Sequence, residues 1–375
     1  MNEENEEPPR LVLVGQLPPP FHGQAVATKL LAESRWEGLE TKVVRMDFSE
    51  EIDEVGSFKL GKLFKLMSLL GKTLAARRRG GHNVLYYPPA GPDTVPVLRD
   101  IVFLFLVRPF FRQTVFHFHA GGLPVYLRKK GIVQKLARFV YRRPSVCIEL
   151  FRKPKEERVA PVIGGKEVVV TNGVEGPPDG LTPERGARRK IAYLGALNEG
   201  KGIIELIQTA AAMAQPDVYF EVAGSWSSAE FEKAAKEAVA KKGLGDKVRF
   251  VGEVRDEAKW KFLLGADVFF FPSHYERENL PLVVIEAMAC GLPVVATRWR
   301  GIPSLLDGCP HARVLDPGDI DGFALALSEI LADDQLLEEA AREDIRSFYR
   351  GRYTVEKFRE GVNGAILEAV QSDRA

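Results

Sequence analysis

Short apolar runs alternate with longer amphipathic stretches along the second half of the chain. The amphipathic stretches have helical spacing, as in Ile203–Ala214, Ser228–Lys242 and Asp319–Leu331. The runs between them lack the polar alternation of a half-exposed strand, which indicates a parallel sheet covered on both faces. The expected strands are Ile191–Leu194, Val218–Ala223, Val248–Val251, Val268–Phe271, Pro293–Ala296 and Ala312–Leu315.

The first half begins in the same way, with strand Leu11–Val14, a Pro/Gly loop over Gly15–Gly23 and helix Gln24–Glu33. Further strands are expected at Lys42–Asp47, Val84–Tyr87, Val115–His119, Val146–Glu149 and Val168–Thr171. We therefore predict two doubly wound, Rossmann-like α/β domains at residues 1–171 and 191–348. The linker is expected at 172–190, which is rich in Gly, Pro and charge and has no periodic apolar pattern.

Composition supports a folded globular protein. Of the 375 residues, 45% are hydrophobic, enough to build cores, and 27% are charged, enough to keep the surface solvated. Three cysteines, Cys147, Cys290 and Cys309, are too few and too scattered for a disulfide framework or a metal cage. The first ten residues are acidic and polar, the reverse of a secretory signal. We therefore predict a cytoplasmic protein.

The formal net charge of +1 conceals a strong asymmetry. Residues 55–166 hold 22 basic and 5 acidic side chains, a balance of +17. Such a field predicts a polyanionic partner, either nucleic acid or an anionic membrane surface. No recognition motif supports nucleic acid, so we expect no nucleic-acid partner.

The segment Phe58–Arg79 has apolar residues at helical spacing with lysines between them and three arginines at its end. This pattern suits an interfacial helix on anionic lipid, and it equally suits a surface helix that buries its apolar stripe in the domain. The lysines concerned are Lys59, Lys62, Lys65 and Lys72. The longest apolar run, Ile101–Val107, is far shorter than the roughly 20 residues that span a bilayer.

The segment Phe269–Thr297 is the most informative. An apolar strand ends at Pro272, a polar loop follows, and a helix is expected to begin near Pro281 with Glu286 in its first two turns. Ligands of parallel sheets bind beyond the carboxyl ends of the strands, so Glu278 and Glu286 would both face that crevice. Carboxylates there can accept hydrogen bonds from ribose and sugar hydroxyls.

The segment Ile191–Ile207 agrees with this reading. It is a strand, a glycine-bearing loop and a helix expected to start at about Gly202. Free amides at that helix N-terminus, together with Lys201, would make an anion site suited to a nucleotide diphosphate.

Both segments resemble the retaining glycosyltransferases of family four, which have the GT-B fold. The match is Glu-x7-Glu followed by Ala-Met-Ala-x-Gly-x-Pro-Val-Val-Ala-Thr. The resemblance implies two domains facing across a cleft and a nucleotide diphosphate sugar as donor. It implies Glu286 on ribose, Lys201 and Gly202 at the diphosphate and Glu278 on the sugar. Glu276, which follows the aromatic residue directly, stays an alternative to Glu278.

Looser matches extend over the rest of the chain. They are Gly23 in the first glycine-bearing loop, His119 beside the donor sugar, Glu253 bordering the base, Asn279 and Leu280 as further donor-binding residues, and residues 349–375 as a helix crossing back to the first domain. Strand alternation puts His117 on the same face as His119, so spacing cannot separate them. One departure is Ala196, where the family usually carries an arginine for the diphosphate.

A metal is not expected. Asp319-Ile320-Asp321 has the spacing of a metal-binding pair, but it precedes a helical pattern, where an acidic residue caps free amides. Family resemblance likewise implies a diphosphate held by amides and basic side chains, with no cofactor.

The predicted function is that of a retaining glycosyltransferase. It would move a sugar from a nucleotide diphosphate sugar to a glycan or lipid-linked acceptor in surface polysaccharide synthesis. A peripheral position on the inner face of the cell membrane would suit such an acceptor. Two alternatives stay open. One is a non-catalytic sugar-nucleotide-binding protein of the same fold, motivated by Ala196, and the other is a GT-B sugar-nucleotide epimerase.

Overall fold

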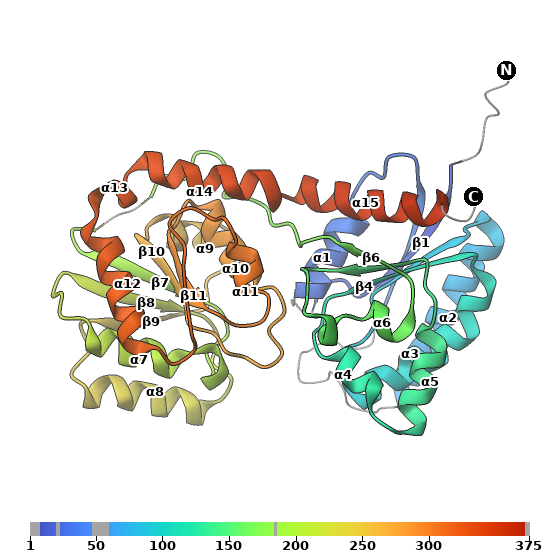
Figure 1. The fold of residues 1–375 in the computed structure, drawn as a ribbon, viewed down its shortest axis with the longest axis horizontal. Helices are drawn as coiled ribbons and strands as arrows, with labels where there is room; N and C mark the ends of the chain where they lie inside the picture. The colour runs from blue at the N-terminus through green and yellow to red at the C-terminus, as the bar shows by residue number, and fades with distance from the viewer. Residues whose placement is uncertain (1–7, 20–22, 47–59, 184–185, 372–375) are drawn as a thin grey trace, which may run out of the picture. The chain divides into compact units, whose positions relative to one another are not determined.

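A computed structural model describes residues 8–19, 23–46, 60–183 and 186–371. The acidic opening of the chain, at residues 1–7, lies outside the described residues. Internal contacts divide the chain into unit 1, Met1–Gly173 with Val355–Ala375, and unit 2, Val174–Thr354. Each unit is built on its own sheet, and Figure 1 labels many of their helices and strands.

The sheet of unit 1 has six strands in the order β2-β1-β3-β4-β5-β6. Every neighbouring pair is parallel. The order is that of flavodoxin-like doubly wound sheets, extended by one strand. The strands are β1 Arg10–Gly15, β2 Glu40–Arg45, β3 Val84–Tyr87, β4 Gln113–Phe118, β5 Val146–Glu149 and β6 Lys166–Val169.

Helices cover both faces of this sheet. Helices α2, α3 and α5 cover one face, and α1 and α15 cover the other (Figure 1), each set burying side chains in its own core cluster. Successive strand residues serve opposite faces, so Leu11 and Leu13 join one core while Val12 and Val14 join the other. The helices are α1 Gly23–Ala32, α2 Leu60–Gly80, α3 Thr94–Val107, α4 Leu123–Arg128, α5 Ile132–Tyr141, α6 Ala160–Ile163 and α15 Val355–Gln371.

Helix α2 divides its apolar side chains between two environments. Leu66, Leu69 and Leu70 are buried against the sheet, whereas Phe64 and Met67 are 74% and 59% exposed. The apolar residues of Phe58–Arg79 therefore do not form one buried stripe among the described residues. Residues 58 and 59 lie outside the described residues, and so do the side chains of residues 60–63.

The sheet of unit 2 also has six strands, in the order β12-β11-β10-β7-β8-β9, all parallel. Counted from its own first strand, this is the 3-2-1-4-5-6 order of dinucleotide-binding folds. The strands are β7 Arg189–Leu194, β8 Val218–Ala223, β9 Val248–Gly252, β10 Val268–Phe271, β11 Val294–Thr297 and β12 Arg313–Leu315. The prediction of two doubly wound parallel sheets is confirmed.

Within unit 2, α7 packs against α12 and α10 packs against α14. Its helices are α7 Ile203–Ala212, α8 Ala229–Lys241, α9 Asp256–Leu264, α10 Leu282–Ala289, α11 Ile302–Leu306, α12 Ile320–Ala332, α13 Asp334–Leu337 and α14 Glu339–Arg352. Short 3-10 turns lie at Arg108–Phe110, Lys155–Glu157 and Glu199–Lys201.

The chain passes between the units at two places. The chain enters unit 2 at Val174 and returns to unit 1 at Val355, compared with expected boundaries at 171 and 349. Residues 349–352 complete α14 of unit 2, and the helix that packs on the sheet of unit 1 starts after them. Among the described residues, no helix is long and apolar enough to cross a membrane.

Candidate functional site

The candidate site lies where the strand order of unit 2 reverses. Strand β7 pairs with β8 along one edge and with β10 along the other, although β10 comes much later in the chain. Loops that follow β7 and β10 therefore leave the same edge of the sheet next to one another, which is where parallel α/β sheets bind ligands. The first loop runs from Gly195 to Gly202, and the second runs from Pro272 to Pro281.

A glycine lets the two loops touch. Gly202 has a φ of 78°, and a Cβ at this position would overlap the carbonyl oxygen of Pro272. The backbone N–H of His274 also donates to the carbonyl of Gly200 at 2.8 Å. Any other residue at Gly202 would carry both backbone strain and a steric clash, so the glycine sets the distance between the loops.

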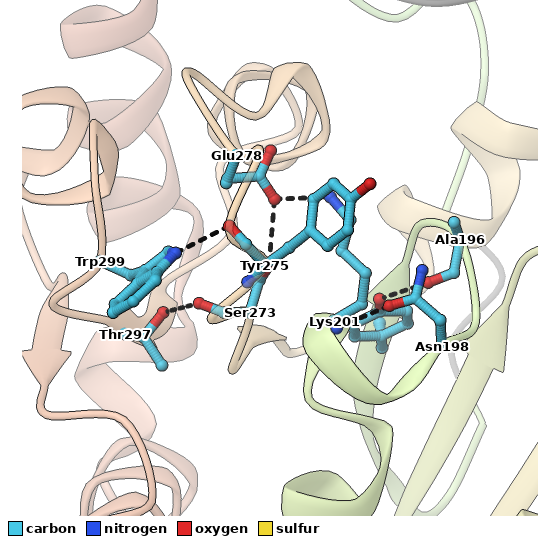
Figure 2. A network of polar contacts seen from close by, with 9 residues as sticks. Ala196, Asn198, Lys201, Ser273, Tyr275, Glu278, Thr297 and Trp299 are labelled. Carbon is cyan, nitrogen blue, oxygen red and sulfur yellow. Dashed lines mark hydrogen bonds and ion pairs between the residues drawn. The ribbon is translucent and has the colours of Figure 1, made fainter. Parts of the chain in front are cut away.

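The contact brings Lys201 and Glu278 together. Lys201 Nζ lies 2.5 Å from Oε2 of Glu278, and the hydroxyl of Ser273 donates to the same oxygen at 3.0 Å (Figure 2). Both charged side chains are largely buried. The alternative carboxylate, Glu276, is exposed. Of the two glutamates, the structure therefore places Glu278, the predicted one, against the lysine.

Aromatic residues and backbone contacts hold this pair. The Lys201 ammonium lies 5.1 Å from the ring centroid of Tyr275, which supplies a cation–π contact. Trp299 donates its indole N–H to the carbonyl of Tyr275 at 2.8 Å, and the hydroxyl of Thr297 donates to the carbonyl of Ser273 (Figure 2). The loop after β11 therefore fixes the loop after β10, which positions Glu278.

The loop after β7 is fixed from within. The side-chain oxygen of Asn198 accepts from the backbone N–H of Lys201 at 3.0 Å, and the hydroxyl of Tyr193 donates to the carbonyl of Ala196 at 3.1 Å. Burial, with a smaller contribution from the charge of Glu278, raises the pKa of Tyr193, so its phenol stays protonated and keeps donating. Helix α7 begins right after Gly202, as predicted.

Glu286 lies in the first two turns of α10, which begins directly after Pro281. Its Oε1 lies 2.7 Å from Nζ of Lys259, on α9, and both side chains are mostly buried. The lysine restricts the carboxylate of Glu286 to one orientation. A carboxylate held in this way presents its remaining lone pairs in fixed directions, as recognition of paired hydroxyls requires.

The other residues assigned to donor binding in unit 2 take different environments. Asn279 and Leu280 are buried beside Glu278. Glu253 is exposed one residue beyond β9 and pairs with Arg255 at 2.7 Å. Ala196, the departure from the family pattern, is exposed.

The predicted residues Gly23 and His119 come after strands β1 and β4 of unit 1, respectively. Gly23 is the first residue of α1, after a loop of which residues 20–22 lie outside the described part. His119 follows the last residue of β4, whereas His117 is inside the strand. Their rings lie 4.0 Å apart, which confirms that they share a face. Because His119 is at the strand end, it is better placed than His117 to meet a ligand.

His117 has a structural partner. Its Nδ1 lies 2.6 Å from the hydroxyl of Tyr86 on β3. Burial lowers the pKa of His117 well below its usual value, and neighbouring His119 lowers it further, so the imidazole of His117 is neutral at pH 7.

Asp319 is a helix cap. Its carboxylate accepts from the backbone N–H of Gly322 at 3.0 Å, at the N-terminus of α12, which confirms the capping interpretation of Asp319-Ile320-Asp321. Within the described part of the chain, no group of three or more His, Cys, Asp or Glu side chains could hold a metal ion.

Sequence reasoning missed the residues that support the site. Lys259 and Trp299 carry no signal in a single sequence, and neither does the hydrogen bond from Ser273 to Glu278, because these contacts exist only once the loops are folded.

Comparison with known proteins agrees with this geometry. Residues 181–347 match the model of the family described as "Glycosyl transferases group 1". The matched segment contains both loops and both glutamates of the candidate site, and it lies entirely within unit 2.

Characterised relatives are similar over part of the chain. A phosphatidyl-myo-inositol mannosyltransferase of Mycolicibacterium smegmatis is 32% identical over 184 residues, which are 46% of this chain and 45% of the relative. The lipopolysaccharide core biosynthesis glycosyltransferase LpsE of Rhizobium meliloti is 29% identical over 242 residues, or 63% of this chain and 67% of the relative. The match thus spans about half the length of the first relative.

Solved structures are similar over nearly the whole chain. Anabaena Alr3699/HepE, solved in complex with UDP, has a TM-score of 0.70 at 18% identity and covers 97% of this chain and 100% of its own. Sucrose-phosphate synthase of Thermosynechococcus elongatus has a TM-score of 0.67 at 20% identity, with 98% of both chains covered. At this identity the likeness shows the fold, and the predicted GT-B class is confirmed.

Proposed function

We propose that the protein moves a sugar from a nucleotide diphosphate sugar to an acceptor with retention of anomeric configuration, and the match of residues 181–347 to the model of the group 1 glycosyltransferases supports this proposal. Unit 2 would bind the donor. The observation that supports this most strongly is the contact of Lys201 with Glu278 where the strand order of unit 2 reverses. This contact places a lysine, which can bind phosphate, next to a carboxylate, which can bind sugar hydroxyls.

Each side chain has a role that its chemistry suits. Lys201 and the amides at the start of α7 would hold the diphosphate, Glu278 the sugar hydroxyls, and Glu286 the ribose. Departure of the nucleoside diphosphate leaves negative charge on its terminal phosphate. Stabilising that charge with a preorganised ammonium and backbone amides is the main catalytic demand. We assign no nucleophile, and His119 of unit 1 is the residue proposed beside the reacting sugar.

Donor binding is tested by thermal denaturation with UDP, UDP-glucose and other nucleotide sugars, because a selective ligand raises apparent stability. We expect one nucleotide to raise the melting temperature of the wild type and the Glu286→Ala variant to lose that shift. The exposed Glu237→Ala variant, on α8 and outside both loops of the candidate site, serves as the control for a lost carboxylate in unit 2. An undiminished shift in Glu286→Ala would move the ribose site elsewhere.

Turnover separates this proposal from its alternatives. We expect release of nucleoside diphosphate from one sugar donor, faster when an acceptor is present. Binding without release with any donor and acceptor would favour a non-catalytic sugar-nucleotide-binding protein. Conversion of the donor sugar without any acceptor would favour an epimerase.

We further propose that the acceptor is a lipid-linked glycan at an anionic membrane, and that the protein acts on the cytoplasmic face. The support is a surface of unit 1 on which large apolar side chains stay exposed among cations. Phe105 on α3 and Phe139 on α5 are 58% and 45% exposed, with ring centroids 6.4 Å apart. Arg142 lies 4.0 Å from the centroid of Phe139. Exposed aromatic residues beside arginines suit a headgroup interface.

Co-sedimentation with anionic vesicles tests the membrane proposal. The Phe105→Ser/Phe139→Ser variant should bind about tenfold less well, because two rings no longer enter the interface. The matched control is Leu325→Ser, since Leu325 is 61% exposed but lies in unit 2. Equal losses in both variants, or wild-type binding that does not fall with salt, would contradict the proposal.

A further inference from the structure

Unit 1 contains a cavity of about 590 Å³ between the edge strand β2 and the C-terminal half of α2. Lys42 and Arg45 of β2 line one side, and Lys72 and Arg79 of α2 line the other. Between the two rows, the floor is made of small or apolar side chains such as Val44 and Ala76. The cavity is thus cationic at its rim and apolar beneath.

Helix geometry explains the arrangement on α2. Lys72 and Arg79 are seven residues apart, which puts them on one face of the helix two turns from each other. Ala75 and Ala76 lie between them and are too small to fill the gap. The long side chains can therefore extend along the walls with their charged ends in the opening, as lysine and arginine do over apolar surface.

Three of the four cations of this cavity have no carboxylate partner among the described residues. Among the described residues that line it there is no aspartate or glutamate. In the part of the chain that the structure describes, Lys42, Lys72 and Arg79 form no ion pair with a carboxylate, and nearby Glu40 is paired with Arg10 at 2.7 Å. Several cations around one cavity repel each other, so an anion in it would be bound favourably.

We propose that this cavity is a second anion site, specific for a phosphomonoester or pyrophosphate group, and distinct from the diphosphate site of unit 2. Doubly charged phosphates suit it because lysine and arginine on opposite walls can each take an oxygen. A volume of about 590 Å³ leaves room for the group that carries the phosphate. That group is either a lipid or a soluble metabolite. The proposal concerns unit 1 alone and does not depend on the activity proposed for unit 2.

Calorimetric titration of the full chain with sodium pyrophosphate at low salt tests the proposal. The titration is done in a Lys201→Ala background, so that the diphosphate site of unit 2 does not contribute. Adding Lys72→Gln and Arg79→Gln should weaken pyrophosphate binding at least about tenfold, since two phosphate contacts are lost. The charge-matched control adds Arg78→Gln and Lys130→Gln, two exposed positions of unit 1 outside the cavity, and should change binding less than about twofold.

Two results would overturn the site. One is equal weakening in the two variants, which would mean a diffuse positive field. The other is no pyrophosphate binding in the Lys201→Ala background. Lys42 and Arg45 would then serve only to prevent the edge strand β2 from pairing with a strand of another chain.

Vesicles distinguish the two sources of phosphate. Phosphatidylcholine vesicles with about one fifth phosphatidic acid present a phosphomonoester at a surface. Binding to them that depends on Lys72 and Arg79 and is displaced by pyrophosphate identifies a lipid headgroup as the ligand. Pyrophosphate binding that depends on these residues, while vesicle binding does not, identifies a soluble phosphate compound.

Discussion

The two units share an architecture but place their chemistry in different parts of it. Unit 2 concentrates it at the carboxyl ends of β7 and β10, where Lys201 and Glu278 are buried in contact. Unit 1 exposes its distinctive side chains on the outer surfaces of its helices. Most of the exposed large apolar side chains among the described residues belong to these helices. A doubly wound sheet can therefore act through its strand ends or through the helices that cover it.

Each unit also buries charged side chains. In unit 1, Asp100 is fully buried, accepts hydrogen bonds from the hydroxyls of Tyr87 and Tyr141, each at 2.7 Å, and pairs with Arg99 at 2.7 Å. In unit 2, Arg342 is almost fully buried and donates to the carbonyl of Ala266 at 2.9 Å. Such groups stabilise a fold only while their partners are in place.

The sharpest test of this comparison is Asp100→Ala. Removing the carboxylate leaves the hydroxyls of Tyr87 and Tyr141 and the amide of Ala90 without their acceptor in a buried site. We expect unit 1 to lose about 3–5 kcal/mol of unfolding free energy while unit 2 is unaffected. Hydrogen exchange measured on peptides from β3 and β4, and separately on peptides from β7 and β8, resolves the two units.

The control for Asp100 is Glu156→Ala, an exposed acidic residue of the same unit. Its effect should stay within about 0.5 kcal/mol. Faster exchange in both units after Asp100→Ala would show that they unfold together, and the comparison between two separate cores would then fail.

Glu278→Ala should abolish most of the proposed activity. Losing the carboxylate that is expected to hold the donor sugar should lower kcat/KM by about 100-fold to 1000-fold, the range seen when one preorganised group is lost. Glu276→Ala is the matched control, because Glu276 is two residues away and exposed. It should stay within about twofold of the wild type. Comparable losses of kcat/KM in both variants would show that the buried carboxylate of Glu278 has no special role.

How much of this the sequence predicts differs between the units. All twelve strands lie within about two residues of their expected positions, because strands buried on both faces leave continuous apolar runs. The site of unit 2 was predictable in its main residues because Glu278, Glu286 and Lys201 lie in segments that resemble a known family. The sequence predicts only an apolar run in the helix Thr94–Val107, because the exposed face of this helix also carries apolar residues and hides the helical period.

The supporting contacts were not predictable. Lys259 reaches Glu286 from another helix, 27 residues away in the chain, and no periodic pattern links them. The cavity beside β2 has the same origin, since its cations come from β2 and α2 and become neighbours only when the sheet edge and the helix pack. Long-range side-chain pairing of this kind is fixed by tertiary structure, which one sequence does not reveal.

Acidification should weaken unit 1 selectively. The folded state lowers the pKa of His117, so below the unfolded value of 6.5 the unfolded chain binds a proton that the folded chain does not. Stability is then lost as pH falls, by about 1 kcal/mol between pH 6.5 and 5.5. Burial also lowers the pKa of His82, so His82 likewise destabilises the folded state as the pH falls. Burial raises the pKa of Glu149, so protonation of Glu149 at lower pH stabilises the folded state.

Urea unfolding followed by hydrogen exchange of β4 peptides measures this pH dependence. His117→Gln should reduce the dependence on pH in unit 1. The control is His311→Asn in unit 2, where a φ of 58° suits asparagine, and it should leave unit 1 unchanged. A wild-type unit 1 that is equally stable at both pH values would contradict the neutral, buried state of His117.

The smallest expected effect concerns the cap of α12 in unit 2. Asp319→Ala removes the acceptor for the amide of Gly322 and should cost about 1 kcal/mol of the stability of unit 2. Asp321→Ala, in the first turn of the helix, should cost less than half as much, since it loses only its interaction with the helix dipole. Denaturation with and without added Mn²⁺ is the measurement. Equal losses of stability in the two variants, together with stabilisation of the wild type by Mn²⁺, would show that Asp319 and Asp321 form a metal site and not a cap. Unit 2 would then have a second ligand-binding centre.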